Sequence, residues 1–92
     1  MYGTDKQLAW VETIIAGWQL QADQQTKMAD ARVACGDLPA AWSDMIKAVA
    51  SEQMSRLRNA PKASDIIDNR HINVGSVIER TAISRYKQPQ SL

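Results

Sequence analysis

The sequence is poor in the residues on which metal binding and covalent cross-linking depend. It contains a single cysteine, Cys35, and a single histidine, His71. A lone cysteine cannot close an internal disulfide, and one cysteine with one histidine cannot supply the clustered ligands of a structural zinc site. We therefore expect no disulfide framework, no metal site and no cofactor, and we expect the reducing cytoplasm as the location.

Long hydrophobic runs and loop-forming residues are also scarce. No apolar stretch approaches the roughly 18 residues that a membrane-spanning helix needs, and residues 1–6 lack the pattern of a secretory signal. With 3 prolines and 4 glycines among 92 residues, 45% of them hydrophobic, the composition is not that of a disordered chain. The sequence predicts one folded domain over residues 1–92 with a modest core and no membrane segment.

The usual catalytic patterns are absent as well. The glycines stand alone, so no phosphate-binding loop is formed. A dyad of Cys35 and His71 is conceivable, but no family signature surrounds either residue. Asp65 and Asp68 are spaced for one turn of a helix, which is typical of solvated carboxylates. The sequence therefore favours a protein that binds something over an enzyme.

Residues 4–34 have the pattern of a long amphipathic helix. Thr4 and Gln7 have the spacing of a capping box, and Gly36 suits a left-handed stop. Apolar residues recur in steps of three and four: Leu8, Val11, Ile15, Trp18 and Ala22. Trp10 and Ile14 widen this stripe to about 160°, more than the ~100° that a surface helix buries. We expect more than one neighbour to cover it.

A second amphipathic helix is predicted over residues 38–59. Asp37 is a good N-cap, Pro39 falls in the first turn, and Asn59 can take a left-handed cap before Pro61. A short loop around Gly36 favours an antiparallel hairpin. The predicted core of this hairpin has five members, with the two tryptophans facing each other: Ile15, Trp18, Trp42, Ile46 and Val49.

The rest of the chain is a connector and a third helix. Residues 60–75 read as the connector, with a short helix capped by Ser64 or Asp65, and Ser76 begins a helix over about 76–88. The β-branched residues between 72 and 86 leave a strand pair as the alternative. The tail, 89–92, should be frayed. The expected fold is all-α, a small helical bundle with a long N-terminal helical hairpin and a shorter C-terminal helix.

Charge is distributed unevenly along the chain. Residues 1–54 carry four basic and seven acidic side chains, a net charge of −3, whereas residues 55–92 carry seven basic and three acidic ones, a net charge of +4. The two halves can match each other within the fold, and a basic half also suits an acidic protein or nucleic acid. The charges alone leave these alternatives open.

A protein partner is the preferred interpretation. Trp10 lies at the edge of the first stripe, where a tryptophan can anchor an interface, and the stripe itself favours a homodimer through this helix. Size and composition favour a regulatory role, like that of the small inhibitors with which phages and mobile elements redirect host machinery. We expect these contact residues: Trp10, Arg56, Arg58, Arg70, Arg80, Arg85 and Lys87.

DNA binding through a helix-turn-helix over residues 64–87 is the alternative. Residues 64–70 would be the support helix, 71–75 the turn and 76–87 the recognition helix, with Arg80, Arg85 and Lys87 among its contacts. However, Arg80 falls where an apolar residue would help the core, and the pI of about 7.9 is low for a dedicated nucleic-acid binder. The partner therefore stays undecided between protein and nucleic acid.

Overall fold

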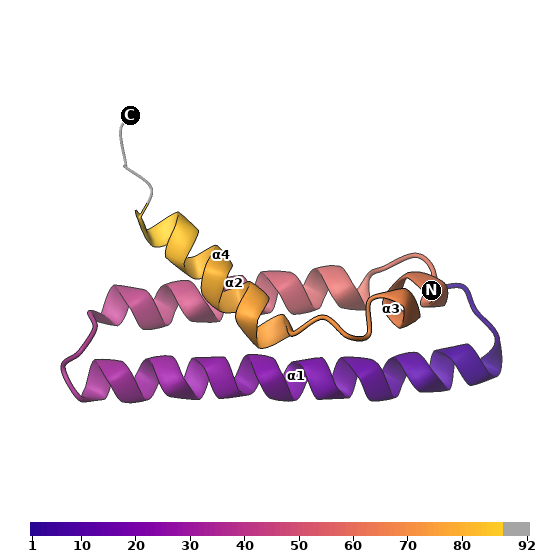
Figure 1. The fold of residues 1–92 in the computed structure, drawn as a ribbon, viewed down its shortest axis with the longest axis horizontal. Coiled ribbons are helices and arrows are strands. Elements are labelled where there is room, and N and C mark those ends of the chain that lie inside the picture. Colours follow the sequence, from indigo (N-terminus) through magenta and orange to yellow (C-terminus); the bar gives the residue numbers. More distant parts are fainter. Residues whose placement is uncertain (88–92) are drawn as a thin grey trace.

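The computed structural model describes residues 1–87, which form four helices (Figure 1). These are α1 (Asp5–Ala34), α2 (Ala40–Arg58), α3 (Ala63–Asp68) and α4 (Val74–Lys87). No strand occurs within the described residues, so the all-α fold with a long N-terminal hairpin is confirmed and the strand pair over residues 72–86 is wrong. The frayed tail expected at 89–92 lies outside the described residues.

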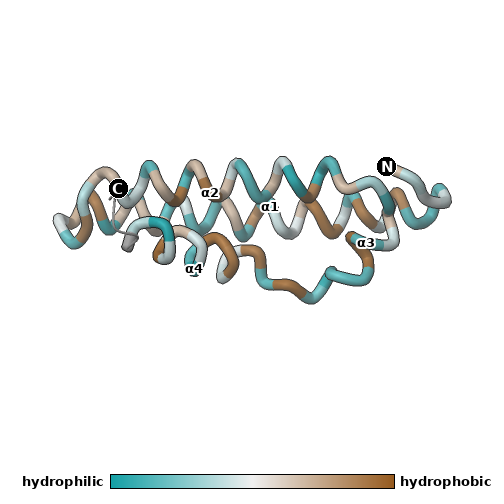
Figure 2. The backbone as a smooth tube through the Cα atoms, turned by 90° about the horizontal axis from the view of Figure 1, so that it is seen from above, coloured by the Kyte–Doolittle hydropathy of each residue, from teal (hydrophilic) through white to brown (hydrophobic). Residues whose placement is uncertain are grey.

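The helices are arranged in two layers. α1 and α2 lie side by side and antiparallel, while α3 and α4 lie on one side of this hairpin (Figures 1 and 2). α4 crosses the hairpin obliquely and packs against both of its helices, whereas α3 packs against α1. The second layer therefore covers one face of the hairpin.

Local signals fix both ends of α1. The Gln7 amide donates to the Thr4 hydroxyl at 3.1 Å, and the Thr4 amide donates to the Gln7 side chain at 2.9 Å, which completes the predicted capping box. After the helix, Gly36 adopts a left-handed conformation with φ +82°, which residues with a Cβ disfavour. The predicted limits of the first helix, about 4–34, are confirmed.

α2 begins two residues later than the sequence predicts. Its N-cap is Pro39, not Asp37, and its first residue is Ala40. A residue that precedes proline is sterically disfavoured in the helical region, so Leu38 cannot join the first turn. The left-handed cap expected at Asn59 is also wrong: its φ is −97°, and its side-chain amide donates to a carbonyl one turn earlier at 2.9 Å.

Backbone pairing with the N-terminal segment holds the start of α3. The caps predicted there, Ser64 or Asp65, are wrong, because the N-cap position is Lys62 and its side chain makes no capping bond. Instead, the Tyr2 amide donates to a carbonyl just before α3 at 2.8 Å, and the Ala63 amide donates to the Tyr2 carbonyl at 2.7 Å. The first residues of the chain are thereby fastened beside α3.

A side chain from α1 caps the start of α4. The helix begins at Val74 rather than at Ser76, and the Asn73 side chain accepts from the Ser76 amide at 3.1 Å. The Gln21 side-chain oxygen accepts from the Val74 amide at 2.8 Å and from the Gly75 amide at 3.3 Å. Two amides that would lack helical acceptors are therefore satisfied by α1.

The core extends from the crossing of α4 over the hairpin to the contact of α3 with α1, where Ala63 and Ile66 are also buried. Ile46 and Val49 of α2 and Ile78 and Ala82 of α4 are almost completely buried. Trp18 of α1 is 2% exposed, and its indole N–H donates to the Ile72 carbonyl at 3.2 Å, which leaves its polar atom satisfied. This bond ties α1 to the segment that leads into α4.

Three of the five predicted core residues are buried, and two are not. Trp18, Ile46 and Val49 belong to the core, whereas Ile15 and Trp42 are only partly buried against it. Trp42 stands edge-on to the Tyr86 ring instead of facing Trp18, with centroids 5.6 Å apart and planes at 88°. Trp18 therefore belongs to the core, whereas Trp42 packs against Tyr86 at its edge.

The wide stripe of α1 is covered in large part from within the chain. α1 packs against α2, α3 and α4, and Val11, Trp18, Ala22 and Ala29 are buried. Ile14 and Ile15 are partly buried, whereas Trp10 stays 48% exposed. Neighbours within the chain therefore cover much of a stripe that is too wide for one of them, which weakens the reason for expecting a homodimer. The dimer itself stays an untested prediction.

Alanine substitutions at two glycines should change the stability of the fold in opposite directions. A Cβ added at Gly3 would lie 2.6 Å from the Cβ of the buried Ala63, whereas one added at Gly17 would meet nothing within 4 Å. Gly3→Ala should lower the free energy of unfolding by about 1–3 kcal/mol through overpacking. Gly17→Ala, the matched control, should raise it by about 0.5–1 kcal/mol because alanine favours the helix. Urea titration measures both, and a Gly3→Ala variant as stable as the parent would contradict the placement of the N-terminal segment.

Candidate functional site

The predicted contact residues do not form one surface. Arg70 and Trp10 meet near the start of α1, where the guanidinium carbon of Arg70 lies 5.2 Å from the centroid of the half-exposed Trp10 ring. This geometry is that of a cation–π contact. Trp10 therefore has a partner within the chain, although it stays 48% exposed.

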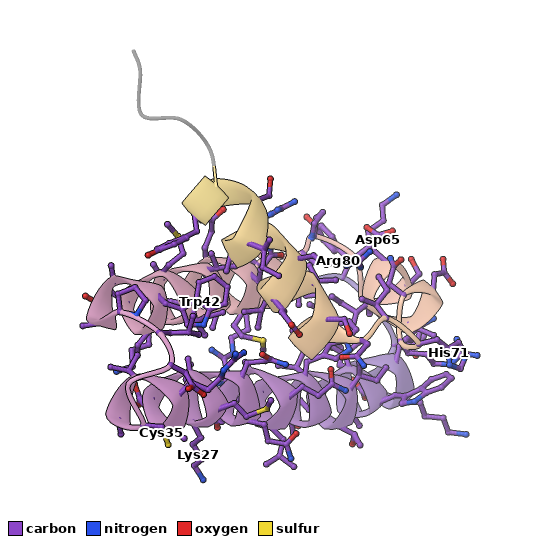
Figure 3. All side chains as sticks on the ribbon, turned by 60° about the vertical axis from the view of Figure 1, so that its left-hand side comes forward. Lys27, Cys35, Trp42, Asp65, His71 and Arg80 are labelled. Carbon is purple, nitrogen blue, oxygen red and sulfur yellow. The ribbon has the colours of Figure 1, made fainter. Side chains whose placement is uncertain are left out.

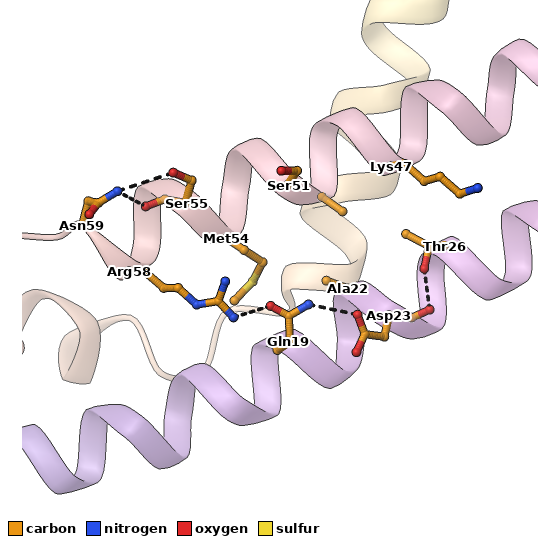
Figure 4. A pocket seen from close by; sticks show the side chains of 11 residues that line it. Gln19, Ala22, Asp23, Thr26, Lys47, Ser51, Met54, Ser55, Arg58 and Asn59 are labelled. Atoms are coloured by element: carbon orange, nitrogen blue, oxygen red, sulfur yellow. Dashed lines mark hydrogen bonds between the residues drawn. The ribbon is translucent and has the colours of Figure 1, made fainter.

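Arg58 lies on the face of the hairpin opposite to α4. Its guanidinium donates to the Gln19 side chain, which in turn donates to Asp23 at 2.9 Å (Figure 4). The chain of bonds borders a polar groove of about 550 Å³ between α1 and α2, with Ala22 and Ala50 among its lining residues. Arg58 is thus separated from the other predicted contact residues and is engaged by α1.

The other arginines predicted as contact residues, Arg56, Arg80 and Arg85, belong to α2 and α4. Arg80 and Arg85 line a shallow groove of about 440 Å³ along α4. Arg85 forms a bidentate ion pair with Glu52 of α2, with nitrogen to oxygen distances of 2.8 and 2.9 Å. The hydrogen bond and the charge of Arg85, and after them the charge of Arg56, lower the pKa of the Glu52 carboxyl. The prediction made for the Lys87 side chain lies outside the described residues.

The arrangement of α3 and α4 differs from that of a helix-turn-helix. α3 has six residues and packs on α1, while α4 packs on α1 and α2. In a helix-turn-helix the support helix instead holds the recognition helix. The predicted 64–87 unit therefore lacks its support helix, although Arg80 does project from an exposed part of α4 (Figure 3).

The residues considered for catalysis lie far apart. Cys35 is exposed at the tip of the hairpin, and His71 is exposed at the opposite end of the molecule, beside α3 (Figure 3). The two cannot form a dyad in this structure. Among residues 1–87, no three histidine, cysteine or acidic side chains come together as a metal site requires.

An apolar hollow lies on the other flank of α4, near the tip of the hairpin. Its volume is about 320 Å³, and Arg32 and Glu79 place one charge of each sign beside its apolar lining. The apolar lining residues come from the loop before α2, from α2 and from α4: Leu38, Trp42, Ile83 and Tyr86. Tyr86 is 45% exposed, so the hollow presents aromatic surface to solvent.

The hollow continues toward α1. A small cavity of about 40 Å³ shares Arg32, Trp42 and Glu79 with it and reaches Met28, a methionine that is 58% exposed. Sequence reasoning placed Trp42 in the core and missed the hollow. The available signal was the apolar pair Ile83 and Tyr86 near the end of the last predicted helix, on the same side of that helix.

Comparison with protein-family models, with curated proteins and with solved structures finds no match. None of the helices within residues 1–87 has both the length and the hydrophobicity needed to cross a bilayer.

Two surface carboxylates hold their charges through nearby donors. The hydrogen bond from Arg85, and then the positive charge of Arg85, lower the pKa of Glu52 below its ordinary value of 4.5. A hydrogen bond from Ser43 and then one from Lys47 lower the pKa of Asp30, which links α1 to α2. Each ion pair joins two helices: Lys47 and Asp30 link α2 to α1, and Arg85 and Glu52 link α4 to α2.

The lowered pKa of Glu52 predicts an acid-sensitive contact between α2 and α4. A group whose pKa is lower in the folded state stabilises that state at higher pH, and the stabilisation is lost as pH falls through the folded pKa. Stability should therefore fall between about pH 5 and pH 3. Glu52→Gln and Arg85→Gln should each flatten this decline, because each removes the same ion pair. Thermal unfolding across this range measures it, and a Glu52→Gln variant with the parent's pH profile would contradict the pairing.

Proposed function

We propose that the chain is a non-enzymatic regulatory protein that acts by stoichiometric binding to a protein partner. The observation that carries the proposal is the apolar hollow beside α4, in which Trp42, Ile83 and Tyr86 remain accessible although the core is only a few residues away. Apolar and aromatic side chains in a concave surface are the usual anchors of protein interfaces.

The occupant that fits the hollow is an apolar side chain of a partner protein. A volume of about 320 Å³ accommodates one or two large side chains. Arg32 and Glu79 at the hollow can pair with charges of both signs that flank such an anchor, which favours a polypeptide over a uniformly charged polymer. An inhibitor of host machinery from a phage or mobile element would act in this manner, by covering a surface of its target.

DNA binding remains the second candidate. Arg80 and Arg85 on exposed turns of α4 favour it, as does the net charge of +4 over residues 55–92. The six-residue α3 and its packing on α1 count against the helix-turn-helix version. In the experiment below, nuclease treatment removes nucleic acid, so a partner that is still recovered favours the protein candidate.

Replacing the two sides of the hollow tests the proposal. Leu38→Asp lies in the loop before α2, and Ile83→Asp lies on α4, so the two variants perturb different elements. Each should reduce the partner recovered on the tagged chain from nuclease-treated lysate of the native host by at least about 10-fold, which corresponds to roughly 1.4 kcal/mol of binding. Quantitative mass spectrometry measures the recovered protein.

Leu20→Asp is the matched control. Leu20 is 63% exposed on α1 and does not line the hollow, so the same substitution there should leave recovery unchanged. Circular dichroism would verify that all three variants keep the parent's helicity. A partner retained by both hollow variants, or lost equally with Leu20→Asp, would contradict the proposal.

A further inference from the structure

The groove on the opposite flank of α4 has a different chemistry from the apolar hollow. It is lined by Val77, Arg80, Thr81, Ser84 and Arg85, which recur on one side of the helix. On its α2 side lies Glu52, which pairs with Arg85. The hydrogen bond and the charge of Arg85, and after them the charge of Arg56, lower the pKa of Glu52. The two arginines that line the groove, taken with the one carboxylate that pairs with Arg85, leave a net charge of +1 there.

We propose that this groove binds carboxylate side chains of an acidic segment in the protein partner. The proposal rests on the proposed function and adds the chemistry of the partner. Arg80 is the first contact, because its guanidinium makes only one bond within the described chain, a long one of 3.4 Å from Nε to the Ser76 carbonyl. The hydroxyl groups of Thr81 and Ser84 supply further donors beside it.

Glu52 acts as an internal competitor for this site. Its bidentate pair with Arg85 shows how that guanidinium receives a carboxylate, with both terminal nitrogens at 2.8–2.9 Å from the two oxygens. Both side chains of the pair are about two-fifths exposed, so solvent and an incoming carboxylate can reach them. An acidic ligand can therefore bind Arg80 first and then replace Glu52 on Arg85.

The distribution of charge favours an acidic peptide over a nucleic acid. Glu79 lines the hollow on one flank of α4, and Glu52 borders the groove on the other, so a duplex laid along α4 would bring phosphates toward carboxylates on both sides. On this flank of α4 the arginines of the groove, Arg80 and Arg85, occupy one short stretch, whereas a nucleic acid needs cations spaced along its backbone. A few carboxylates on a flexible segment suit the groove better.

Titration with a capped peptide of six glutamates, followed by amide chemical shifts of the full chain, tests the proposal. The shifts should concentrate at Arg56 and at Arg80 to Arg85. Arg80→Ala should weaken binding at least about 5-fold, and Glu52→Gln should strengthen it about 3-fold because Arg85 is released. The increase in peptide affinity for Glu52→Gln is the distinctive result, since an ion pair with only a structural role would not produce it.

Lys27→Ala is the matched control, because it removes one positive charge from an exposed position of α1 that lines neither the groove nor the hollow. Its affinity should stay within about 2-fold of the parent. Equal losses for Arg80→Ala and Lys27→Ala, no gain for Glu52→Gln, or no shifts at millimolar peptide would overturn the proposal. Tighter binding of a DNA duplex than of the peptide, with log-linear salt dependence, would overturn it in favour of nucleic acid.

Failure of peptide binding in the groove can be distinguished from failure of partner capture through the hollow. Leu38→Asp should leave peptide binding in the groove intact, because Leu38 lines the hollow only. Loss of partner capture by Leu38→Asp without specific peptide binding would support the hollow and overturn the groove. Specific peptide binding together with undiminished capture by the hollow variants would support the groove alone.

Discussion

The docking of α4 across the hairpin is the contact on which the rest of this structure depends. Ile78 and Ala82 are completely buried there, and burying a side chain of the size of isoleucine stabilises a fold by about 1.5–3 kcal/mol. Gln21 fixes the first turn of the helix by accepting from two backbone amides, and Glu52 holds its last turns through Arg85. The apolar side of α4 does not by itself specify the position of the helix along the hairpin, whereas the two hydrogen bonds to Gln21 specify it at the first turn.

The oblique crossing divides the surface around α4 into two chemically distinct parts. On the side of the hairpin tip, α4 leaves Trp42 only partly covered and adds Tyr86 beside it, which creates the apolar hollow. On the side of the C-terminal half of α2, the same helix aligns Arg80 and Arg85 along the basic groove. A partner with an apolar anchor and an acidic segment could engage both flanks at once, and this would add affinity without any new contact in the core.

The parts of the fold that depend on neighbours in the sequence could be predicted, and those that depend on distant residues could not. The Thr4 capping box and the left-handed Gly36 fixed the limits of α1 because each signal acts within one turn. The start of α4 was misplaced because its capping residue, Gln21, lies 53 positions before Val74. Trp42 was assigned to the core because the pattern of α2 does not reveal how far α4 extends over it.

The candidate site shows the same limit. The sequence indicated that the basic residues of its second half mattered, but it could not divide them among surfaces. Arg58 turned to the far face of the hairpin, Arg70 joined Trp10, and Arg80 and Arg85 came together on α4. Which residues share a surface follows from the rotation of each helix about its axis, which the packing of α4 determines.

The most direct test of this account is a measurement of nuclear Overhauser effects in the wild-type chain. A docked α4 predicts cross-peaks between the Tyr86 ring and the Trp42 indole, whose centroids lie 5.6 Å apart, and between the Trp18 indole N–H and Ile72, whose carbonyl accepts its hydrogen bond. Absence of both sets of cross-peaks in a chain with full helicity would show that α4 does not cross the hairpin. Neither the apolar hollow nor the basic groove would then exist as described.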